Sequence, residues 1–564
     1  MSKDIYVLGT GLSHDGSAVI LKNGEIAIAI EKERLSRIKH DGGNDSLAIQ
    51  YCLDALGITM NDIALAVQCE NFVIPERNRF QGERIFKSYP KIPLHSISHH
   101  LAHAYSTIGT SPFSAFNILV IDGCGSPYQQ CTEDLYPPLE DLGLSEDGLH
   151  GLICEKDSFY HYDGENLKVL FKDFSEMDIP KANAVQMPTT KHSIGGFYAY
   201  ISQYCFGNMS DAGKLMGLAP FGNENAYTQE AFSFDNGRVF LREEWKKALQ
   251  TPALGYHDFQ KSFQYYADIA FWAQKEVEKA INYIVESRTS LNSDQPLCYS
   301  GGVALNAVAN AKMIQNGLVN QLYIEPAAAD NGLALGCAYY GWLELLKGKR
   351  KQHNGNTCFG ISYSDEDVAK TLKNSFPNLN VTHFQNRSEF LSSTAKLIDE
   401  GKTIGWFQGR SEFGPRALGS RSILASPFDE RMQLHINQNI KFREDFRPFA
   451  PAVLAKDVHQ YFKNGFDSPY MILVDKVKEE WSSKLKAVSH VNGSARVQTV
   501  EGSWNKLLYE LLLELKNSSG HGMVLNTSFN KKGQPIVETP QQAIELFNES
   551  ALDVLAIENY IIQK

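Results

Sequence analysis

The stretch FNILVIDGCGS, residues 116–126, decides the fold class. A short apolar run of this kind predicts a buried strand, and it stops at Asp122 beside glycines, which favour a turn. The pattern returns at residues 296–314, where an apolar strand leads through two glycines into a helix, and at residues 323–341, where the turn contains Asp330. Strands that end in such turns and lead into helices predict an α/β domain with its ligand at the strand ends.

Two further segments support the α/β class. Residues 5–36 contain two apolar runs joined by Asn23-Gly24, which is the strongest short hairpin signal. A loop interrupts the first run and presents His14 at a strand end. Residues 266–287 predict a helix whose apolar stripe consists of Ile269, Ala273, Val277, Ile281 and Ile284.

Length and composition limit the class of protein. A chain of 564 residues is too long for one core, so two to four domains are expected. The net charge of −11 argues against a non-specific nucleic-acid binder, although a local basic pocket for a small anion remains open. Nine scattered cysteines without a CxxC pair indicate neither a disulfide framework nor a thiolate zinc site. No signal core or transmembrane run is apparent, so a soluble cytoplasmic protein is expected.

The composition of the sequence changes after Tyr340. The segment LKGKRKQHNGNTCFG is charged and rich in turn residues, which is typical of a linker. A second α/β unit follows, in which TIGWFQG forms a strand before a segment rich in glycine and arginine. We therefore predict one domain over residues 1–350, a linker over 351–365 and a second domain over 366–564.

The stretch ISHHLAHAYS contains three histidines. His99 and His103 are four residues apart, so a helix would place them on one face with Cβ atoms about 5–6 Å apart. His100 points about 100° away from them. From this spacing alone, a packing or surface role for the two histidines is as well supported as metal binding. The glutamate of HExxH is missing, so a metalloprotease would lack its general base. Asp122 and Asp330 are each typical turn residues, but together with the pair they would suit a first-row divalent ion.

His14 lies in GLSHDGSA, between small residues at a break between strand and loop. A neutral histidine near pH 7 is the usual general base for taking a proton from a hydroxyl. A loop histidine is otherwise simply exposed, so both interpretations stay open at this point.

Arginines and glycines alternate in GRSEFGPRALGSRSILASP, and NIKFREDFRPFAP adds more cations downstream. Such segments offer backbone amides and planar guanidinium groups to phosphate or carboxylate. Residues 410–447 hold seven basic and five acidic side chains, so a small-anion pocket fits better than a nucleic-acid surface. The alternative, that this segment is a charged surface exposed to solvent, would not explain the glycines and prolines between the arginines. Arg496, Asn526 and Ser528 follow turns or end strands further on, where they could face the same pocket.

Taken together, these segments closely resemble the O-carbamoyltransferase family often called NodU/CmcH, which includes the tobramycin and cephalosporin carbamoyltransferases. The match runs from residue 11 to about residue 537. It rests on SHDGSA, EKERLSRIKHD, SHHLAHAYS, LVIDGCG, GKLMGLAPFG, SGGVALN, PAAADNGLALG, FGPRALGSRSILASP, FREDFRPFAP, GSARVQTV and LNTSFNKKGQPIV. The combination of GPRALGSRSILASP with FRPFAP is its most specific part.

The resemblance implies an N-terminal TsaD-like domain with an actin/Hsp70-type fold and a C-terminal YrdC-like α/β domain. In that family carbamoyl phosphate and ATP react in the YrdC-like domain, where the carbamate formed by dephosphorylation is adenylated. The carbamoyl-adenylate then passes to the metal site of the TsaD-like domain, where an acceptor hydroxyl attacks it. Iron(II) is the implied metal, although the ligand set also permits manganese or zinc, and Mg would accompany ATP.

The resemblance also implies roles for individual residues. His99, His103, Asp122 and Asp330 resemble metal ligands, and His14 resembles the general base. The adenylate would lie near Lys39, Gly301, Gly302, Asn306 and Asn331. Asn331 departs from expectation, since a second acid beside Asp330 would be unsurprising. The pocket for carbamoyl phosphate and ATP would contain Arg416, Lys441, Arg447, Arg496, Asn526 and Ser528.

The main interpretation is therefore an ATP-dependent O-carbamoyltransferase acting on a small natural product in secondary metabolism, with no nucleic-acid or membrane partner. A fused tRNA threonylcarbamoylation enzyme is disfavoured by the negative charge. A non-enzymatic actin-like regulator would have no use for the metal quartet or the arginine pocket. The acceptor is left open. Residues 125–195 are rich in aromatics and acids and are a candidate lining for a cationic acceptor, and oligomeric state is not predicted.

Overall fold

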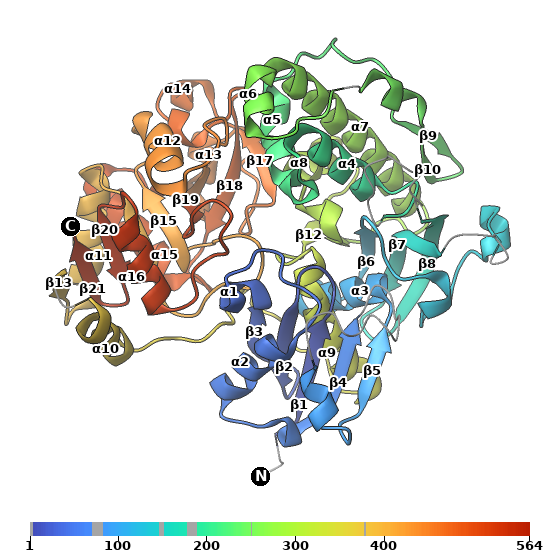
Figure 1. Cartoon of the computed structure of the whole chain (residues 1–564), viewed down its shortest axis with the longest axis horizontal. Helices are drawn as coiled ribbons and strands as arrows, with labels where there is room; N and C mark the ends of the chain where they lie inside the picture. The colour runs from blue at the N-terminus through green and yellow to red at the C-terminus, as the bar shows by residue number, and fades with distance from the viewer. Residues whose placement is uncertain (1–3, 70–82, 146–151, 178–188, 250, 377–378) are drawn as a thin grey trace. The chain divides into compact units, whose positions relative to one another are not determined.

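The computed structural model describes residues 4–69, 83–145, 152–177, 189–249, 251–376 and 379–564 (Figure 1). Its chain divides into two compact units. The first contains the residues up to Glu25, residues 42–53 and residues 58–353, and the second contains residues 26–41, 54–57 and 354–564. Both are mixed α/β structures, which confirms the predicted class.

The first sheet has the strand order β3-β2-β1-β4-β5, and its strands belong to the first unit apart from residues 26–31 of β3. Its strands are β1 (Tyr6–Gly11), β2 (Ser17–Lys22), β3 (Glu25–Glu31), β4 (Ile63–Cys69) and β5 (Leu94–Ile97). β1 and β2 are antiparallel, whereas β4 and β5 run parallel to β1 and to each other. Asn23 and Gly24 join β2 to β3 with φ of 52° and 83°, so the predicted two-residue hairpin turn is confirmed.

The second sheet repeats this topology strand for strand. Its strands are β6 (Phe116–Ile121), β7 (Ile153–Tyr162), β8 (Leu167–Glu176), β11 (Leu297–Ser300) and β12 (Leu322–Ile324), in the order β12-β11-β6-β7-β8. β6, β7 and β8 form an antiparallel meander, and β11 and β12 run parallel to β6. The first unit is therefore built from two halves of the same design.

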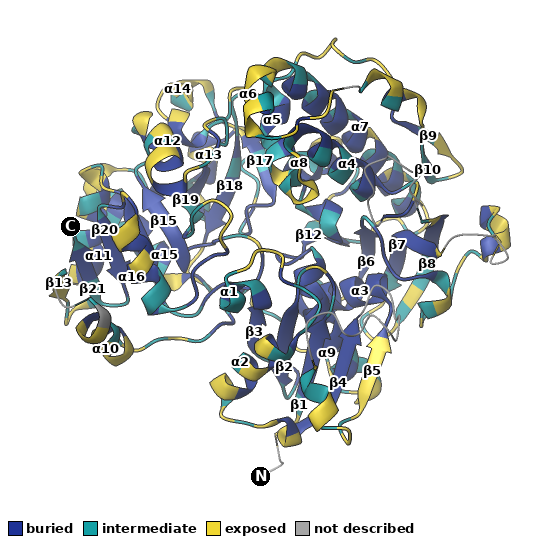
Figure 2. Ribbon diagram, in the orientation of Figure 1, coloured by how far each residue is buried: buried dark blue, intermediate teal, exposed yellow. Residues whose placement is uncertain are grey.

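Helix α3 (His99–Thr110) follows the last strand of the first half, and α9 (Leu333–Tyr340) follows the last strand of the second. Every residue of α3 is buried (Figure 2). Gly336 lets the two helices meet, because a Cβ at this position would lie 1.7 Å from the carbonyl oxygen of Ala102. The predicted helix over 266–287 is confirmed as α7 (Phe263–Thr289), with all five stripe residues buried.

The first unit contains further helices and one further hairpin. They are α2 (Ser46–Leu56), α4 (Ile194–Phe206), α5 (Ala212–Leu218), α6 (Tyr256–Lys261), α8 (Ala307–Gln315) and the hairpin β9 (Phe232–Asp235) with β10 (Arg238–Leu241). In the described part of the chain, no helix has both the length and the apolar character needed to cross a membrane.

Replacing Gly336 with alanine is expected to destabilise the first unit by about 3 kcal/mol or more, because the methyl group would overlap the backbone of α3. Urea unfolding followed by circular dichroism would measure the loss. Gly213 in α5 is the matched control, since a Cβ there meets nothing within 4 Å, and Gly213→Ala is expected to be neutral or mildly stabilising. Equal midpoints for both variants would contradict the close packing of α3 and α9.

The second unit contains a nine-stranded mixed sheet. Across the sheet its strands are β13 (Asn380–His383), β21 (Tyr560–Gln563), β20 (Val554–Ile557), β14 (Ile404–Phe407), β15 (Arg421–Ala425), β19 (Met523–Ser528), β16 (Ala450–Leu454), β18 (Ser494–Val500) and β17 (Leu473–Lys476). The predicted strand TIGWFQG is β14. Its short helices are α1 (Lys32–Ser36), α12 (Arg431–His435), α13 (Val458–Tyr461), α14 (Glu479–Ser482) and a π-helix (Ile436–Lys441).

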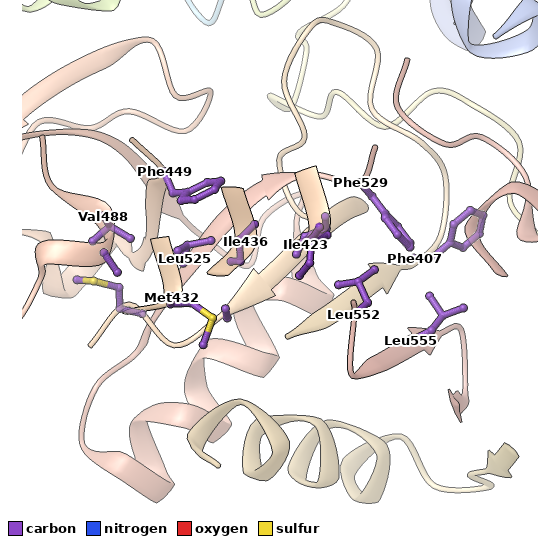
Figure 3. Close-up of a cluster of buried hydrophobic side chains, with 14 of the residues drawn as sticks. Phe407, Ile423, Met432, Ile436, Phe449, Val488, Leu525, Phe529, Leu552 and Leu555 are labelled. Carbon is purple, nitrogen blue, oxygen red and sulfur yellow. The ribbon is translucent and has the colours of Figure 1, made fainter. Parts of the chain in front are cut away.

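Side chains along these strands alternate between two buried layers. Phe407 and Ile423 lie in one apolar cluster (Figure 3), whereas their sequence neighbours Trp406 and Leu424 lie in another. Helices α10 (Asp365–Ser375) and α16 (Pro540–Glu549), together with α12, α13 and the π-helix, contribute to the first cluster, and α11 (Arg387–Asp399) and α15 (Lys506–Ser519) contribute to the second. A strand period of two thus fixes which side of the sheet each helix covers.

Candidate functional site

Four side chains of the first unit converge on one point. Asp122 Oδ2 lies 2.9 Å from His99 Nε2 and 3.2 Å from His103 Nε2, and the two Nε2 atoms are 3.2 Å apart. Asp330 Oδ1 lies 3.5 Å from His99 Nε2 and 4.0 Å from His103 Nε2. All four residues are buried, and one ligand atom from each lies within 4.8 Å of the others. Two nitrogen and two carboxylate donors so placed fit a divalent first-row metal.

The duplicated fold explains why these residues meet. His99 and His103 are one helical turn apart at the start of α3, in the first half. Asp122 follows β6 and Asp330 precedes α9, so both carboxylates come from the second half. Gly302 borders the site, since a Cβ there would lie 3.2 Å from Asp122 Oδ1. The strand ends predicted to bind a ligand therefore do come together.

Electrostatics keep the two carboxylates ionised. Burial opposes ionisation, but the adjacent histidines outweigh it and hold the pKa of Asp122 and of Asp330 below its usual range. Sequence reasoning missed Ser300 at the end of β11, whose Oγ lies 3.1 Å from His103 Nδ1. Such a contact to the second ring nitrogen orients a metal-binding histidine. The only sequence signal for Ser300 is its place directly before the Gly-Gly turn.

His14 is exposed, and its Nδ1 lies 3.1 Å from Asp330 Oδ2. The Asp330 carboxylate raises the pKa of His14 to about 10, so the imidazole is protonated at neutral pH in this arrangement. His14 therefore lies in direct contact with one carboxylate of the quartet.

The other residues predicted near the adenylate fall into two sets. Gly301 and Asn331 border the quartet: Gly301 packs on the backbone of Ile121, and the Asn331 carbonyl accepts a hydrogen bond from Ser17. Asn306 instead caps α8, with its Oδ1 accepting from Ala309 N, and pairs with a neighbouring glutamine through its amide.

The structure places Lys39 with the second unit, in segment 26–41. The positive charge of Lys39 contributes to lowering the pKa of Lys441, so these two ammonium groups lie in one electrostatic neighbourhood. Lys39 is exposed, whereas Lys441 is buried and donates to Ser528 Oγ at 3.1 Å. The two lysines predicted for separate parts of the site thus belong to the same unit.

A cluster of cations, which we call the basic cluster, lies in the second unit. Its members are Arg416, Lys441, Arg443, Arg447 and Arg496. Burial is the largest cause that lowers the pKa of Arg416, Lys441, Arg443 and Arg496, and the charges of other members lower it further. Among the described residues, Arg416 Nε, Arg496 Nε and Arg443 Nη2 are buried without a hydrogen-bond partner. So many desolvated cations are typical of a site for a multiply charged anion.

Two of the predicted polar residues end β19 beside this cluster. Asn526 donates to Gln498 Oε1 at 2.8 Å, and Ser528 contacts Lys441 as described. Arg443 is the member that sequence reasoning left out of the pocket, although it lies in the same KFR run as Lys441.

The loop that contains Arg416 is held by buried carboxylates. Glu412 Oε1 accepts hydrogen bonds from the amides of Leu418 and Ser420 at 2.8 and 2.6 Å. On its other side, Arg34 donates to the Gly414 carbonyl at 2.8 Å and pairs with the buried carboxylate of Glu31. Gly414 has φ of 124°, a conformation that favours glycine. This segment of the second unit therefore fixes the loop before any anion binds.

The candidate acceptor region lies partly outside the described residues, at 146–151 and 178–188. In the described part, two acids of the segment CEKDSFYHYDGE (residues 154–165) are buried and two, Asp163 and Glu165, are exposed. Asp157 is buried and pairs with Arg288 at 2.7 Å, and Glu155 is buried against Lys172. These two acids give no support to a cationic acceptor, because their charges are already compensated.

Comparison with known proteins decides the family. A model of the carbamoyltransferase N-terminus matches residues 7–89 and 64–339, and a model of the carbamoyltransferase C-terminus matches residues 395–564. The chain belongs to the carbamoyltransferase family. The predicted resemblance to NodU/CmcH-type O-carbamoyltransferases is thereby confirmed.

Two of the relatives of this carbamoyltransferase match nearly its whole length. It is 30% identical to nodulation protein NolNO of Sinorhizobium fredii, over 98% of this chain and 79% of that one. It is 29% identical to protein sll1178 of Synechocystis, over 99% and 97%. With the 3′-hydroxymethylcephem-O-carbamoyltransferase of Streptomyces clavuligerus it shares 31% identity over 58% of this chain and 60% of that one. The protein is a carbamoyl-transferring enzyme, as predicted.

Proposed function

We propose that this carbamoyltransferase is an ATP-dependent O-carbamoyltransferase that forms carbamoyl-adenylate from carbamoyl phosphate and ATP, and then transfers the carbamoyl group to a hydroxyl of a small natural product. The observation that most supports this is the presence of two chemically different sites in one family member. One is a buried two-histidine, two-carboxylate quartet, and the other is a basic cluster of four half-buried arginines around the buried Lys441. A one-step hydrolase would need only one of them.

We assign the first reaction to the second unit and infer that its domain is YrdC-like. Carbamoyl phosphate and the ATP-Mg complex are multiply charged anions, which the basic cluster is suited to bind. Asn526 and Ser528 supply polar groups at the same sheet edge. Carbamoyl phosphate decomposes readily in water, and a buried pocket would protect it as well as bind it.

We assign the transfer step to the first unit, and infer that it has an actin/Hsp70-type, TsaD-like fold. The two sheets of equal topology support this inference. His99, His103, Asp122 and Asp330 would hold the metal, which we infer to be iron(II), with manganese or zinc as alternatives. The bound ion would supply positive charge for a phosphate-bearing ligand. His14 would take the proton of the acceptor hydroxyl, which requires that the charge of Asp330 be compensated by something other than His14.

We further propose the domain limits 1–350 and 366–564, joined by 351–365, with residues 26–41 serving the second unit. A cytoplasmic location and a role in secondary metabolism complete the proposal. The acceptor is a small alcohol.

The test is a coupled assay with the whole chain. Carbamoyl phosphate is expected to stimulate ATP consumption, and incubation with candidate alcohols is expected to add about 43 Da to one of them, detected by mass spectrometry. If ATP consumption instead requires threonine and bicarbonate, the protein is a threonylcarbamoylation enzyme and the proposal fails. The proposal also fails if carbamoyl phosphate has no effect.

Replacing His14 with asparagine is expected to separate the two reactions. Transfer to the acceptor should fall by about 10²–10⁴-fold, whereas carbamoyl-phosphate-dependent ATP consumption should stay within about threefold of the wild-type rate. His257, an exposed residue of α6, provides the control variant His257→Asn, which should change neither rate. Equal losses of both rates in His14→Asn would contradict the role of His14 in transfer alone.

A further inference from the structure

One buried carboxylate outside the quartet contacts two of the three chain segments that supply its members. Glu155 on β7 is fully buried. Its Oε2 accepts hydrogen bonds from His100 N at 3.2 Å, in the first turn of α3, and from Ser126 N at 2.9 Å, in the turn after Asp122. None of the roles proposed above uses Glu155.

The contacts of Glu155 are part of a backbone seam. Gly125 N donates to the Glu155 carbonyl at 3.0 Å, and Glu155 N donates to the Ser126 carbonyl at 3.1 Å. Ser126 Oγ in turn accepts from His99 N at 2.9 Å. The first two amides of α3 are therefore satisfied by this turn and this carboxylate, and a negative charge at a helix N-terminus is itself favourable.

Close packing makes the seam tight. A Cβ at Gly125 would lie 2.6 Å from Glu155 Oε2 and 2.9 Å from His100 Cδ2, so only glycine lets the turn reach both groups. His100, the third histidine of the stretch, has its Nδ1 2.7 Å from Ser158 Oγ on β7. That contact fixes the rotation of α3 about its axis and so the direction of His99 and His103.

The charge of Glu155 is compensated on the side away from the quartet. Lys172 on β8 is fully buried and binds Glu155 and Glu133, and its Nζ lies 3.1 Å from the hydroxyl of Tyr160. Glu133 also accepts from Ser98 Oγ at 2.5 Å, directly before α3. Burial of charged groups such as Glu155 and Lys172 costs desolvation free energy, which their pairing offsets. A buried ion pair of this kind is therefore weak evidence of a purely stabilising role.

We propose that Glu155, paired with Lys172, is a positioning residue that sets the separation between His99 and His103 on α3 and Asp122 after β6, and thereby the metal affinity of the quartet. This inference rests on the proposed metal site. It assigns to the ion pair of Glu155 and Lys172 a role in placing the proposed metal ligands, in addition to a contribution to the stability of the fold.

The test measures metal binding to the metal-free chain with Co²⁺, by titration of its visible absorption and by competition with a chelator. The double variant Glu155→Met/Lys172→Met removes both charges of the pair together, and Glu133, which loses its lysine, keeps hydrogen bonds from Ser98 Oγ and Tyr160 OH. It is expected to weaken Co²⁺ binding by about 10–100-fold and to alter the Co²⁺ spectrum. Glu155→Gln/Lys172→Met keeps an oxygen for the two amides and is expected to recover most of the affinity.

Asp157→Asn is the matched control, because it breaks another buried ion pair on the same strand, with Arg288. It is expected to lower stability and to leave the Co²⁺ affinity and spectrum unchanged. If the double methionine variant does not fold, Ser126→Ala tests the same seam by removing the acceptor of His99 N.

The outcomes separate the two hypotheses. Wild-type affinity and spectrum in the double methionine variant, or in Ser126→Ala where that variant replaces it, would overturn the positioning role while the metal site stands. A wild-type chain that binds no Co²⁺ would overturn the metal site and this inference with it. Weakened binding in Asp157→Asn equal to that of the double variant would also overturn the inference, because it would reduce the effect to general destabilisation.

Discussion

Asp122→Asn is expected to lose the bound metal and at least about 10³-fold of carbamoyl transfer. Asp122 Oδ2 is the atom nearest to both histidine nitrogens, so it is the ligand around which the quartet is organised. Asparagine has the same shape but no charge, and leaves Asp330 as the only carboxylate. Metal analysis of the purified protein should find about one equivalent in the wild type and none in the variant.

Asp173→Asn controls for loss of a buried carboxylate in the same unit. Asp173 is fully buried and pairs with Lys156 at 2.8 Å and Arg238 at 2.8 Å, away from the quartet. Its replacement should reduce stability but retain the metal. Retention of a full equivalent of metal and full transfer in Asp122→Asn would remove the quartet from the mechanism.

The same site predicts a pH dependence of metal binding. Burial opposes protonation of His99, but the carboxylates of Asp330 and Asp122 outweigh it and raise the pKa of His99 well above its ordinary value. A metal binds the neutral ring, so binding to the metal-free protein must release this proton. The apparent affinity should therefore rise about tenfold per pH unit at neutral pH, and fall on acidification. Chelator competition between pH 6 and 8 would measure the slope, and an affinity independent of pH would contradict it.

The sequence was sufficient to predict that the four residues of the quartet come together, because each member has a local signal. His99 and His103 have helical spacing, and Asp122 and Asp330 each follow or precede an apolar strand at a glycine-rich turn. Hydrophobic periodicity also located the hairpin at Asn23-Gly24 and helix α7. These patterns depend on neighbours within a few residues, which is the range over which propensity and periodicity act.

Features that depend on distant residues were beyond such reasoning. The two halves of the first unit share a topology without sharing a sequence repeat, so the duplication is visible only in the strand pairing. Segment 26–41 joins the second unit although the chain reaches that unit's core only after residue 353. Glu155 and Asp157 lie in the region 125–195 that the sequence predicts as a candidate acceptor lining, because a strand of alternating charge gives no sign of partners on other elements such as Lys172 and Arg288.

The basic cluster leads to a prediction in which stability and binding change in opposite directions. In the described residues, Arg496 has no carboxylate within ion-pair distance, and the charges of Arg416 and Arg447 lower its pKa beyond the effect of burial. Arg496→Met removes one of several repelling cations and keeps an apolar stem of similar length. Without ligand, the variant is therefore expected to be as stable as the wild type or more stable.

With ligand the order should reverse. Binding of carbamoyl phosphate to the wild type should raise its unfolding free energy by about 2.7 kcal/mol at a concentration 100 times the Kd, and the variant should gain almost nothing. Carbamoyl-phosphate-dependent ATP consumption should fall by about 10³-fold, since a desolvated guanidinium contributes strongly to binding a charged phosphate. Differential scanning fluorimetry with and without carbamoyl phosphate would measure the first effect, and a phosphate-release assay the second.

Arg431→Met is the control, since Arg431 is an exposed arginine of the same segment and is already paired with Asp429 at 2.9 Å. It should retain the ligand-induced stabilisation and the activity. A structural arginine would give a different pattern from the one expected of Arg496, because its loss lowers stability with and without ligand alike. A cation that destabilises the ligand-free protein and binds the anion gives another pattern. Its replacement raises the stability of the ligand-free protein and abolishes the stabilisation by ligand. If Arg496→Met is less stable than the wild type without ligand but is stabilised equally by carbamoyl phosphate, the basic cluster is part of the fold and is not the anion site.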